Sequence, residues 1–168
     1  MLVSFLSYSQ KYNADKSSVK FLSIAAIETI TGVNSESSSI FNEATGEVVF
    51  AIPINEFTFD KPLMKQQFNE KYMESDKFPK ATFQGKITGY QTGGAGEQKA
   101  LATGKLTIHG VAQEVQIPGT LEKTGDQVSM KAKFMVKLAD YNITIPKLFW
   151  QKIAEQVEVT VDFSYKPL

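Results

Sequence analysis

The stretch that decides the fold reads Gly104-Lys-Leu-Thr-Ile-His-Gly-Val-Ala-Gln-Glu-Val-Gln-Ile-Pro118. Successive side chains of a β-strand point to opposite faces, so alternating apolar residues share one face. Here the alternation runs on both sides of His109-Gly110, and its apolar members are Leu106, Ile108, Val115 and Ile117. Glycine adopts backbone conformations that other residues disfavour, which suits Gly110 to a tight turn. The stretch therefore predicts a β-hairpin.

The same alternation recurs along most of the chain. It is clearest in residues 127–138 and 157–165, where apolar side chains occupy every second position and polar ones lie between them. Further strands are expected at residues 19–26, 28–33, 38–41, 47–54, 81–89, 100–108 and 114–121. Strands with one apolar and one polar face are typical of antiparallel sheets that are covered on one side.

About eight to ten such strands must bury their apolar faces together, and a sheet closed on itself does so while removing its edges. The predicted fold is all-β, an antiparallel up-and-down β-barrel of about eight strands. A β-sandwich is the alternative that the alternation leaves open. A barrel of this size either fills its interior with side chains or holds one small ligand.

Two segments interrupt the β pattern. Residues 60–72 predict a helix, with Asp60 as a cap and Pro62 in the first turn. Residues 146–154 are apolar, follow a proline and predict a second short helix. The first helix carries an apolar stripe of Leu63, Met64, Phe68 and Tyr72. Both segments are expected to cap or line the ends of the barrel.

Composition limits the function. A chain of 168 residues fits one domain, here residues 11–168, and formal net charge is zero. All 18 basic residues are lysines scattered along the chain, which disfavours nucleic-acid binding and polybasic membrane attachment. Cysteine is absent.

Residues 1–10 are expected to be a signal-peptide remnant or an edge strand, because their apolar run is too short to span a bilayer.

Two motifs resemble the YceI-like family. One is the hairpin itself, a strand ending Gly-x-Leu-Thr-Ile-His-Gly-Val, then a polar pair and a Val-x-Ile-Pro strand. The other is residues 77–87, which resemble that family's Tyr/Phe-Pro-x-Ala-x-Phe element. The resemblance covers roughly residues 20–165. It implies a lipocalin-like barrel that holds a long apolar lipid of the isoprenoid or fatty-acyl class.

The chain departs from the family pattern at three places. Residues 13–21 lack the family's histidine, and Asp60-Lys61-Pro62 stands where an Arg-Asp pair is usual. Residues 138–143 replace an Arg-x-Asp-Phe/Tyr-Gly-Ile element and keep Asp140 and Tyr141. These changes affect polar groups that would hold a lipid head group, so the resemblance does not identify the lipid.

Candidate chemistry is sparse. His109 is the only histidine, so no zinc or Ser-His-Asp set can be recognised. We expect it to tie the hairpin turn or close a cavity end; ligand contact and catalysis with a carboxylate are the alternatives. Glu70 and Glu74 are expected on a solvated helix face.

The sequence therefore predicts non-enzymatic binding, transport or sequestration of an apolar lipid, without metal or cofactor. A periplasmic or secreted location, a possible homodimer and no membrane span are expected. The alternatives are a structural or interaction barrel without ligand and a His109-dependent enzyme. Predicted polar contacts are His109 and Tyr141, and the predicted cavity lining is Phe50, Ile52, Phe68, Tyr72, Phe83, Met130, Phe134, Trp150 and Phe163.

Overall fold

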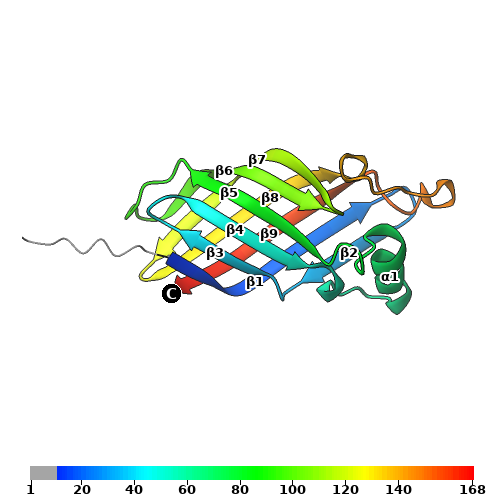
Figure 1. Cartoon of the computed structure of the whole chain (residues 1–168), viewed down its shortest axis with the longest axis horizontal. Helices are drawn as coiled ribbons and strands as arrows, with labels where there is room; N and C mark the ends of the chain where they lie inside the picture. Colours follow the sequence, from blue (N-terminus) through cyan, green and yellow to red (C-terminus); the bar gives the residue numbers. More distant parts are fainter. Residues whose placement is uncertain (1–10) are drawn as a thin grey trace, which may run out of the picture.

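The computed structural model describes residues 11–168, so the expectation for residues 1–10 lies outside the described residues. Within them, the chain is a single antiparallel sheet rolled into a barrel (Figure 1). The strands are β1 (Lys11–Ile24), β2 (Thr29–Asn34), β3 (Ser38–Asn42), β4 (Glu47–Pro53), β5 (Lys80–Thr88), β6 (Glu97–Ile108), β7 (Val111–Thr124), β8 (Gln127–Lys137) and β9 (Gln156–Pro167).

The barrel closes where β1 pairs with β9 over a ladder from Tyr12↔Pro167 to Leu22↔Glu158. On its other edge, β1 pairs with β3 near its start and with β2 near its end. The short strands β2 and β3 therefore share one strand position beside β1, so the nine strands form an eight-stranded barrel. This confirms the predicted up-and-down barrel and excludes the sandwich.

The hairpin that the sequence emphasised joins β6 to β7. Ile108 pairs with Val111, so His109 and Gly110 form a two-residue turn. Both have positive φ, at 53° and 72°, as a type I′ turn requires. Gly110 is needed for a second reason: a Cβ there would lie 2.5 Å from the ring of Phe78.

The first expected helix is present, and the second is much shorter than expected. Residues 60–72 form α1 (Pro62–Gln67) and then a single wide turn, η2 (Phe68–Tyr72). Pro62 opens the helix as predicted, but the expected cap at Asp60 is wrong, because the capping position falls on Lys61 and has no side-chain bond. Residues 11–168 contain no helix with the length and apolar character needed to cross a membrane.

The predicted second helix is only one 3-10 turn, η4 (Lys147–Phe149). Two bonds tie the chain that follows it to the first strands and prevent a longer helix. Gln151 accepts a bond from the amide of Ile27, and the Ala154 amide donates to Ser23 Oγ, each at 2.9 Å. Two further 3-10 turns, η1 (Ile54–Glu56) and η3 (Leu138–Tyr141), complete the connections.

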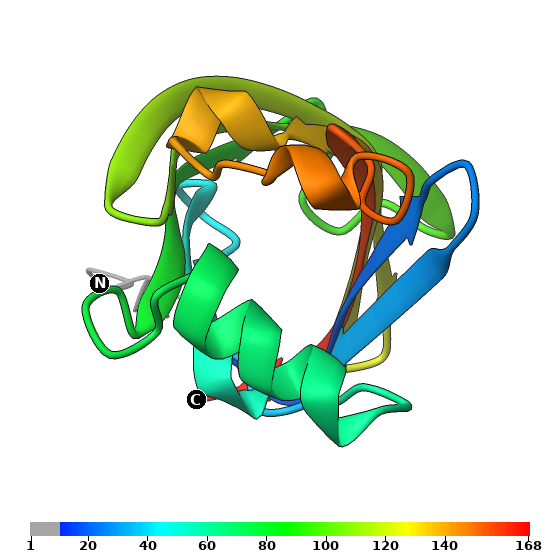
Figure 2. The same cartoon turned by 90° about the vertical axis from the view of Figure 1, so that its right-hand side faces the viewer.

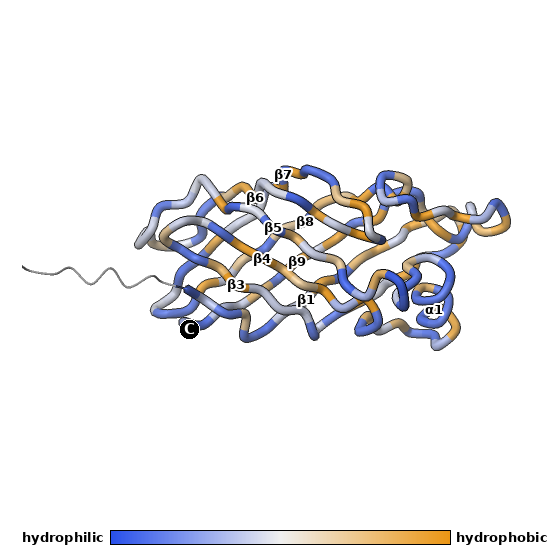
Figure 3. The backbone as a smooth tube through the Cα atoms, viewed as in Figure 1, coloured by the Kyte–Doolittle hydropathy of each residue, from blue (hydrophilic) through white to orange (hydrophobic). Residues whose placement is uncertain are grey.

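One end of the barrel is filled by side chains. The alternation of hydrophilic and hydrophobic residues along each strand (Figure 3) sends the apolar ones inward. At the end opposite α1 the inward side chains are large and at most 2% exposed: Tyr12, Phe41, Val48, Val128 and Tyr165. This end is therefore closed by a packed core.

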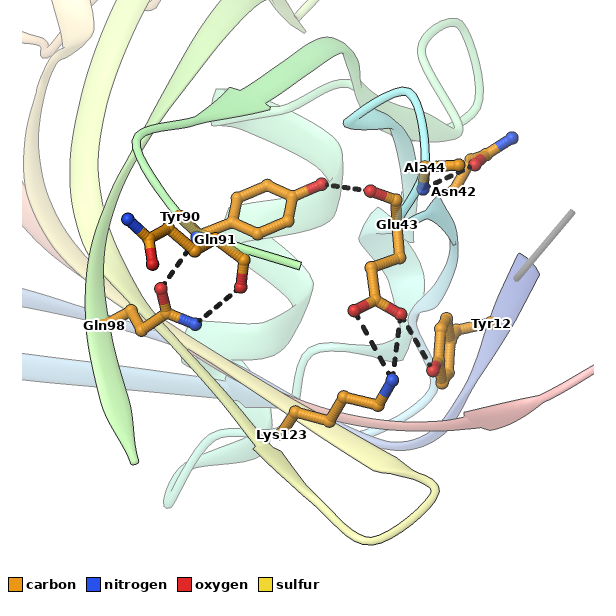
Figure 4. A network of polar contacts seen from close by, with 8 residues as sticks. All are labelled: Tyr12, Asn42, Glu43, Ala44, Tyr90, Gln91, Gln98 and Lys123. Carbon is orange, nitrogen blue, oxygen red and sulfur yellow. Dashed lines mark hydrogen bonds and ion pairs between the residues drawn. The ribbon is translucent and has the colours of Figure 1, made fainter. Parts of the chain in front are cut away.

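A partly buried ion pair lies at the same end (Figure 4). Glu43 is 4% exposed, and its carboxylate lies 3.2 Å from Lys123 Nζ. Tyr12 donates to the same carboxylate at 3.1 Å, and Tyr90 donates to the Glu43 backbone oxygen at 2.6 Å. Burial acts to lower the pKa of Lys123, but the contacts with Glu43 and Tyr12 together outweigh burial and raise it. The pair satisfies its charges internally.

We predict an alkaline weakness at this closed end. The Tyr165 hydroxyl lies 2.6 Å from Ser39 Oγ, and burial raises the Tyr165 pKa far above its usual value. Above about pH 10 the unfolded chain releases this proton. The folded protein retains it, so stability falls as pH rises. Tyr165→Phe should lose about 1 kcal/mol at neutral pH and shift the alkaline loss to higher pH, as measured by urea unfolding across the pH range.

Ser39→Ala is the matched control for that variant. It removes the same hydrogen bond but keeps the ionisable group, so it should weaken the fold at neutral pH and retain the alkaline loss. An alkaline transition of Tyr165→Phe identical to that of the wild type would contradict the assignment.

Candidate functional site

An apolar cavity of about 280 Å³ occupies the other part of the barrel and reaches the end where α1 lies. Figure 2 looks onto that end, with α1 crossing the opening and the η3 and η4 segments along its far side. We call this end the mouth. Polar lining residues are few, and among them are Ser23, Gln67 and Tyr72.

Most predicted lining residues lie around this cavity. They are Phe50, Ile52, Phe68, Tyr72, Phe83, Met130, Phe134 and Phe163. The prediction for Trp150 is wrong: this residue does not line the cavity and is 61% exposed. It follows η4, and its ring N–H donates to the Ile145 carbonyl at 3.3 Å, which holds the ring outside the barrel. His109 and Tyr141 are also outside this lining.

Strand register explains how distant residues meet in the cavity. Phe50 pairs with Phe83 across β4 and β5, and Met130 pairs with Phe163 across β8 and β9. The barrel then brings Phe50 and Phe163 together, with ring centres 5.0 Å apart and planes at 80°. Edge-to-face contacts of this kind are favourable between aromatic rings. These rings form the inner end of the cavity, next to the packed core.

A cluster of four phenylalanines holds η2 over the mouth. The Phe68 ring stacks on Phe21 at 5.4 Å and also lies 5.5 Å from Phe57 and 5.0 Å from Phe59. Phe21 lies across Gly32, where a Cβ would come within 2.3 Å of its ring. Sequence reasoning found Phe68 through its helical stripe but missed the other three as a group. The one sequence signal for this cluster is the Phe57-Thr-Phe59 pair just before the helix.

His109 connects three segments at the mouth. Its Nε2 lies 2.7 Å from Glu74 Oε2, and its Nδ1 lies 3.0 Å from the Tyr141 backbone oxygen. Both neighbours are acceptors, so a ring that carries a proton on each nitrogen donates to both. Bonds from His109 and then Lys77 lower the pKa of Glu74. The predicted role of tying the turn agrees with these contacts.

Glu74 corrects an expectation. It does not lie on a solvated helix face, because the helix ends before it and its own φ is 47°. His109 and Asn142, next to Tyr141, are the other two non-glycine residues with positive φ in residues 11–168. Such conformations are costly and persist where surrounding contacts enforce them. Tyr141 itself is 4% exposed, and burial raises its pKa.

The barrel wall is incomplete beside this group. β7 pairs with β8 only from Gly119 to Thr124, so its first half diverges from β8. The η3 turn covers the gap, with Gln113 donating to the Asp140 backbone oxygen at 2.8 Å. Across residues 11–168 no three histidine, aspartate or glutamate side chains are grouped to hold a metal ion.

A closed antiparallel barrel with eight strand positions and an apolar interior is a lipocalin-like β-barrel, and this is the class of fold that the chain adopts. The YceI-like domain model matches residues 11–165, and the chain belongs to that family. No curated protein matches the sequence.

Solved structures share the fold at low identity. BcnA of Burkholderia cenocepacia is 23% identical with a TM-score of 0.74, over 88% of this chain and 95% of that one. A polyisoprenoid binding domain from Saccharophagus degradans, implicated in plant cell wall breakdown, is 17% identical with a TM-score of 0.81, over 94% and 98%. The Campylobacter jejuni YceI protein is 12% identical with a TM-score of 0.59, over 100% and 90%.

We predict that the His109 contacts stabilise the mouth. His109→Asn keeps a residue that favours this turn but is too short to reach both acceptors. It should lower the free energy of unfolding by about 1–2 kcal/mol, as for lost part-buried hydrogen bonds. Lys77→Gln is the control, because Lys77 is an exposed partner of Glu74 and should cost under about 0.5 kcal/mol. Equal losses in urea unfolding would contradict this role.

Proposed function

We propose that this protein binds one long apolar lipid chain, of the isoprenoid or fatty-acyl class, inside the barrel and releases it unchanged. The apolar cavity, open toward the mouth and stopped by the packed core, is the observation that carries the proposal. Burying apolar surface gives roughly 25 cal/mol per Å², less the cost of ordering the ligand. The cavity supplies such surface from nearly every strand.

The cavity's size supports a chain as ligand. An engineered apolar cavity of roughly 150 Å³ in another protein binds benzene. The space here, about 280 Å³, is nearly twice as large. A barrel packed throughout, the condition for a purely structural module, does not describe this interior.

The two ends differ in a way that orients the ligand. At the closed end the charges of Glu43 and Lys123 satisfy each other, so a polar head group has no partner there. At the mouth Gln67 and Tyr72 line the cavity and can contact a head group. The apolar tail therefore enters first and the head group stays at the mouth.

Two further lines bear on the proposal. The Saccharophagus degradans relative is a polyisoprenoid binding domain, which supports the isoprenoid class here. His109, the candidate for a catalytic alternative, lies outside the cavity lining and has both ring nitrogens engaged. This arrangement favours binding without chemical conversion. Export and a homodimer stay predictions.

The first test fills the cavity. Ala102 lines it, whereas its neighbour Thr103 is exposed on the outer face of β6. Ala102→Phe should weaken binding of a fluorescent polyene fatty acid by about tenfold or more, because the ring takes the ligand's space. Thr103→Phe adds the same ring outside and should bind as the wild type does. Native mass spectrometry should find lipid on the wild type, and failure to bind any apolar chain would refute the proposal.

The second test concerns release. If η2 gates the mouth, Phe68→Ala should speed dissociation of the same ligand, because the aromatic cluster loses its central ring. It should also cost roughly 2–4 kcal/mol of stability, less than for a fully buried ring, since Phe68 is half-buried. Stopped-flow fluorescence measures the rate. Lower stability with an unchanged rate would make η2 a structural cap only.

A further inference from the structure

The mouth is surrounded by apolar side chains that contact solvent. Six large apolar residues within residues 11–168 are more than 60% exposed, and five of them lie at this end. We call these five the rim. The rim is Ile24, Ile27, Leu63, Leu148 and Trp150, with exposures of 66%, 64%, 62%, 89% and 61%. Grouped exposed apolar residues indicate an interaction surface more often than isolated ones do.

The rim residues come from three segments: the β1–β2 turn, the η4 loop and α1. Ile24 and Ile27 lie at the β1–β2 turn, which bonds to the η4 loop through the Ile27 amide and the Gln151 oxygen at 2.9 Å. That loop projects beyond the barrel (Figure 1), and α1 stands on the other side of the opening (Figure 2). None of the five rim residues lines the cavity, but Met64, next to Leu63, and Ile153, in the η4 loop, do.

Charge adds to this surface. Residues 61–67 and 144–154 contain four lysines and no acidic residue, although the chain as a whole is neutral. Acidic residues resume just outside them, at Asp60 and Glu155, and Glu28 lies on the β1–β2 turn. The four lysines thus lie on the same two segments as the exposed Leu63, Leu148 and Trp150.

We propose that the rim docks on an anionic lipid bilayer, with the mouth facing the acyl chains. This proposal rests on the proposed function and names where the ligand is collected. Tryptophan and leucine next to lysine suit the bilayer interface, where the apolar parts enter and the ammonium groups meet anionic head groups. A second copy docked mouth to mouth would bring the lysines of both copies together, which favours the bilayer as occupant.

The test uses Trp150 as reporter, because it is the only tryptophan. Vesicles of phosphatidylcholine with phosphatidylglycerol should shift its emission to shorter wavelength and carry the protein in flotation. Leu148→Glu should weaken this binding by about tenfold or more. Leu168→Glu is the matched control, because Leu168 is 73% exposed at the closed end and should leave binding unchanged.

A second variant tests the charge. Lys147→Gln with Lys152→Gln should weaken binding to the anionic vesicles by about fivefold per lysine, and should leave the smaller binding to pure phosphatidylcholine unchanged. No vesicle binding by the wild type, equal loss in both glutamate variants, or a dimer in sedimentation that Leu148→Glu dissolves would overturn the proposal.

Delivery of the polyene fatty acid from cyclodextrin separates the two proposals. Leu148→Glu should load normally from cyclodextrin but about tenfold more slowly from vesicles. If the wild type binds vesicles but no fatty acid from either source, the proposed function fails and the docking surface stands. If it loads from cyclodextrin yet ignores vesicles, the docking surface fails and the proposed function stands.

Discussion

The ladder between β1 and β9 is the constraint on which the rest of the structure depends. Without it the sheet would have two long open edges, and its apolar face would remain in contact with water. Closing the sheet turns that face into an interior. The long β1 makes closure possible because its other edge pairs with β2 and β3 in turn.

A closed interior can be filled or left hollow, and side-chain size decides between the two along this barrel. Tyrosine and phenylalanine meet at the closed end, where Phe41 and Tyr165 are almost fully buried. Along the cavity, several inward positions of β5–β8 carry small residues, namely Ala81, Ala100, Ala102, Gly119 and Ala132. Small inward residues leave unfilled volume where large ones would touch across the barrel.

Much of this architecture could be predicted because alternation reports directly on strand faces. It indicated the inward positions of β8 and β9, and Gly110 marked the hairpin turn. Tertiary bonds decided what local patterns could not: Ser23 and Ile27 hold the η4 loop, so its apolar residues do not form a helix. Trp150 was expected inside because it is apolar, yet the same loop places it in solvent.

The polar groups were harder to anticipate because their partners are distant in sequence. Glu43 lies in an ordinary turn, and its contact with Lys123 depends on strands that meet only when the barrel closes. Glu74 was misread because it was expected on a helix face, whereas the helical turn ends at Tyr72 and Glu74, with a positive φ, contacts His109 through its carboxylate. No local sequence signal marks the wide η2 turn, which moves the residues after it, Glu74 among them, out of helical register.

The packed floor of the barrel has a kinetic consequence. A cavity closed at one end has a single route, so a cargo molecule must leave by the way it entered. Such a protein cannot act as a conduit that spans two membranes and passes molecules along a continuous channel. Under the proposed function, delivery of a lipid would require the protein to leave one membrane and turn its mouth toward another. With one ligand bound per barrel, the flux would then depend on the number of protein copies and on the time each copy needs to exchange its ligand.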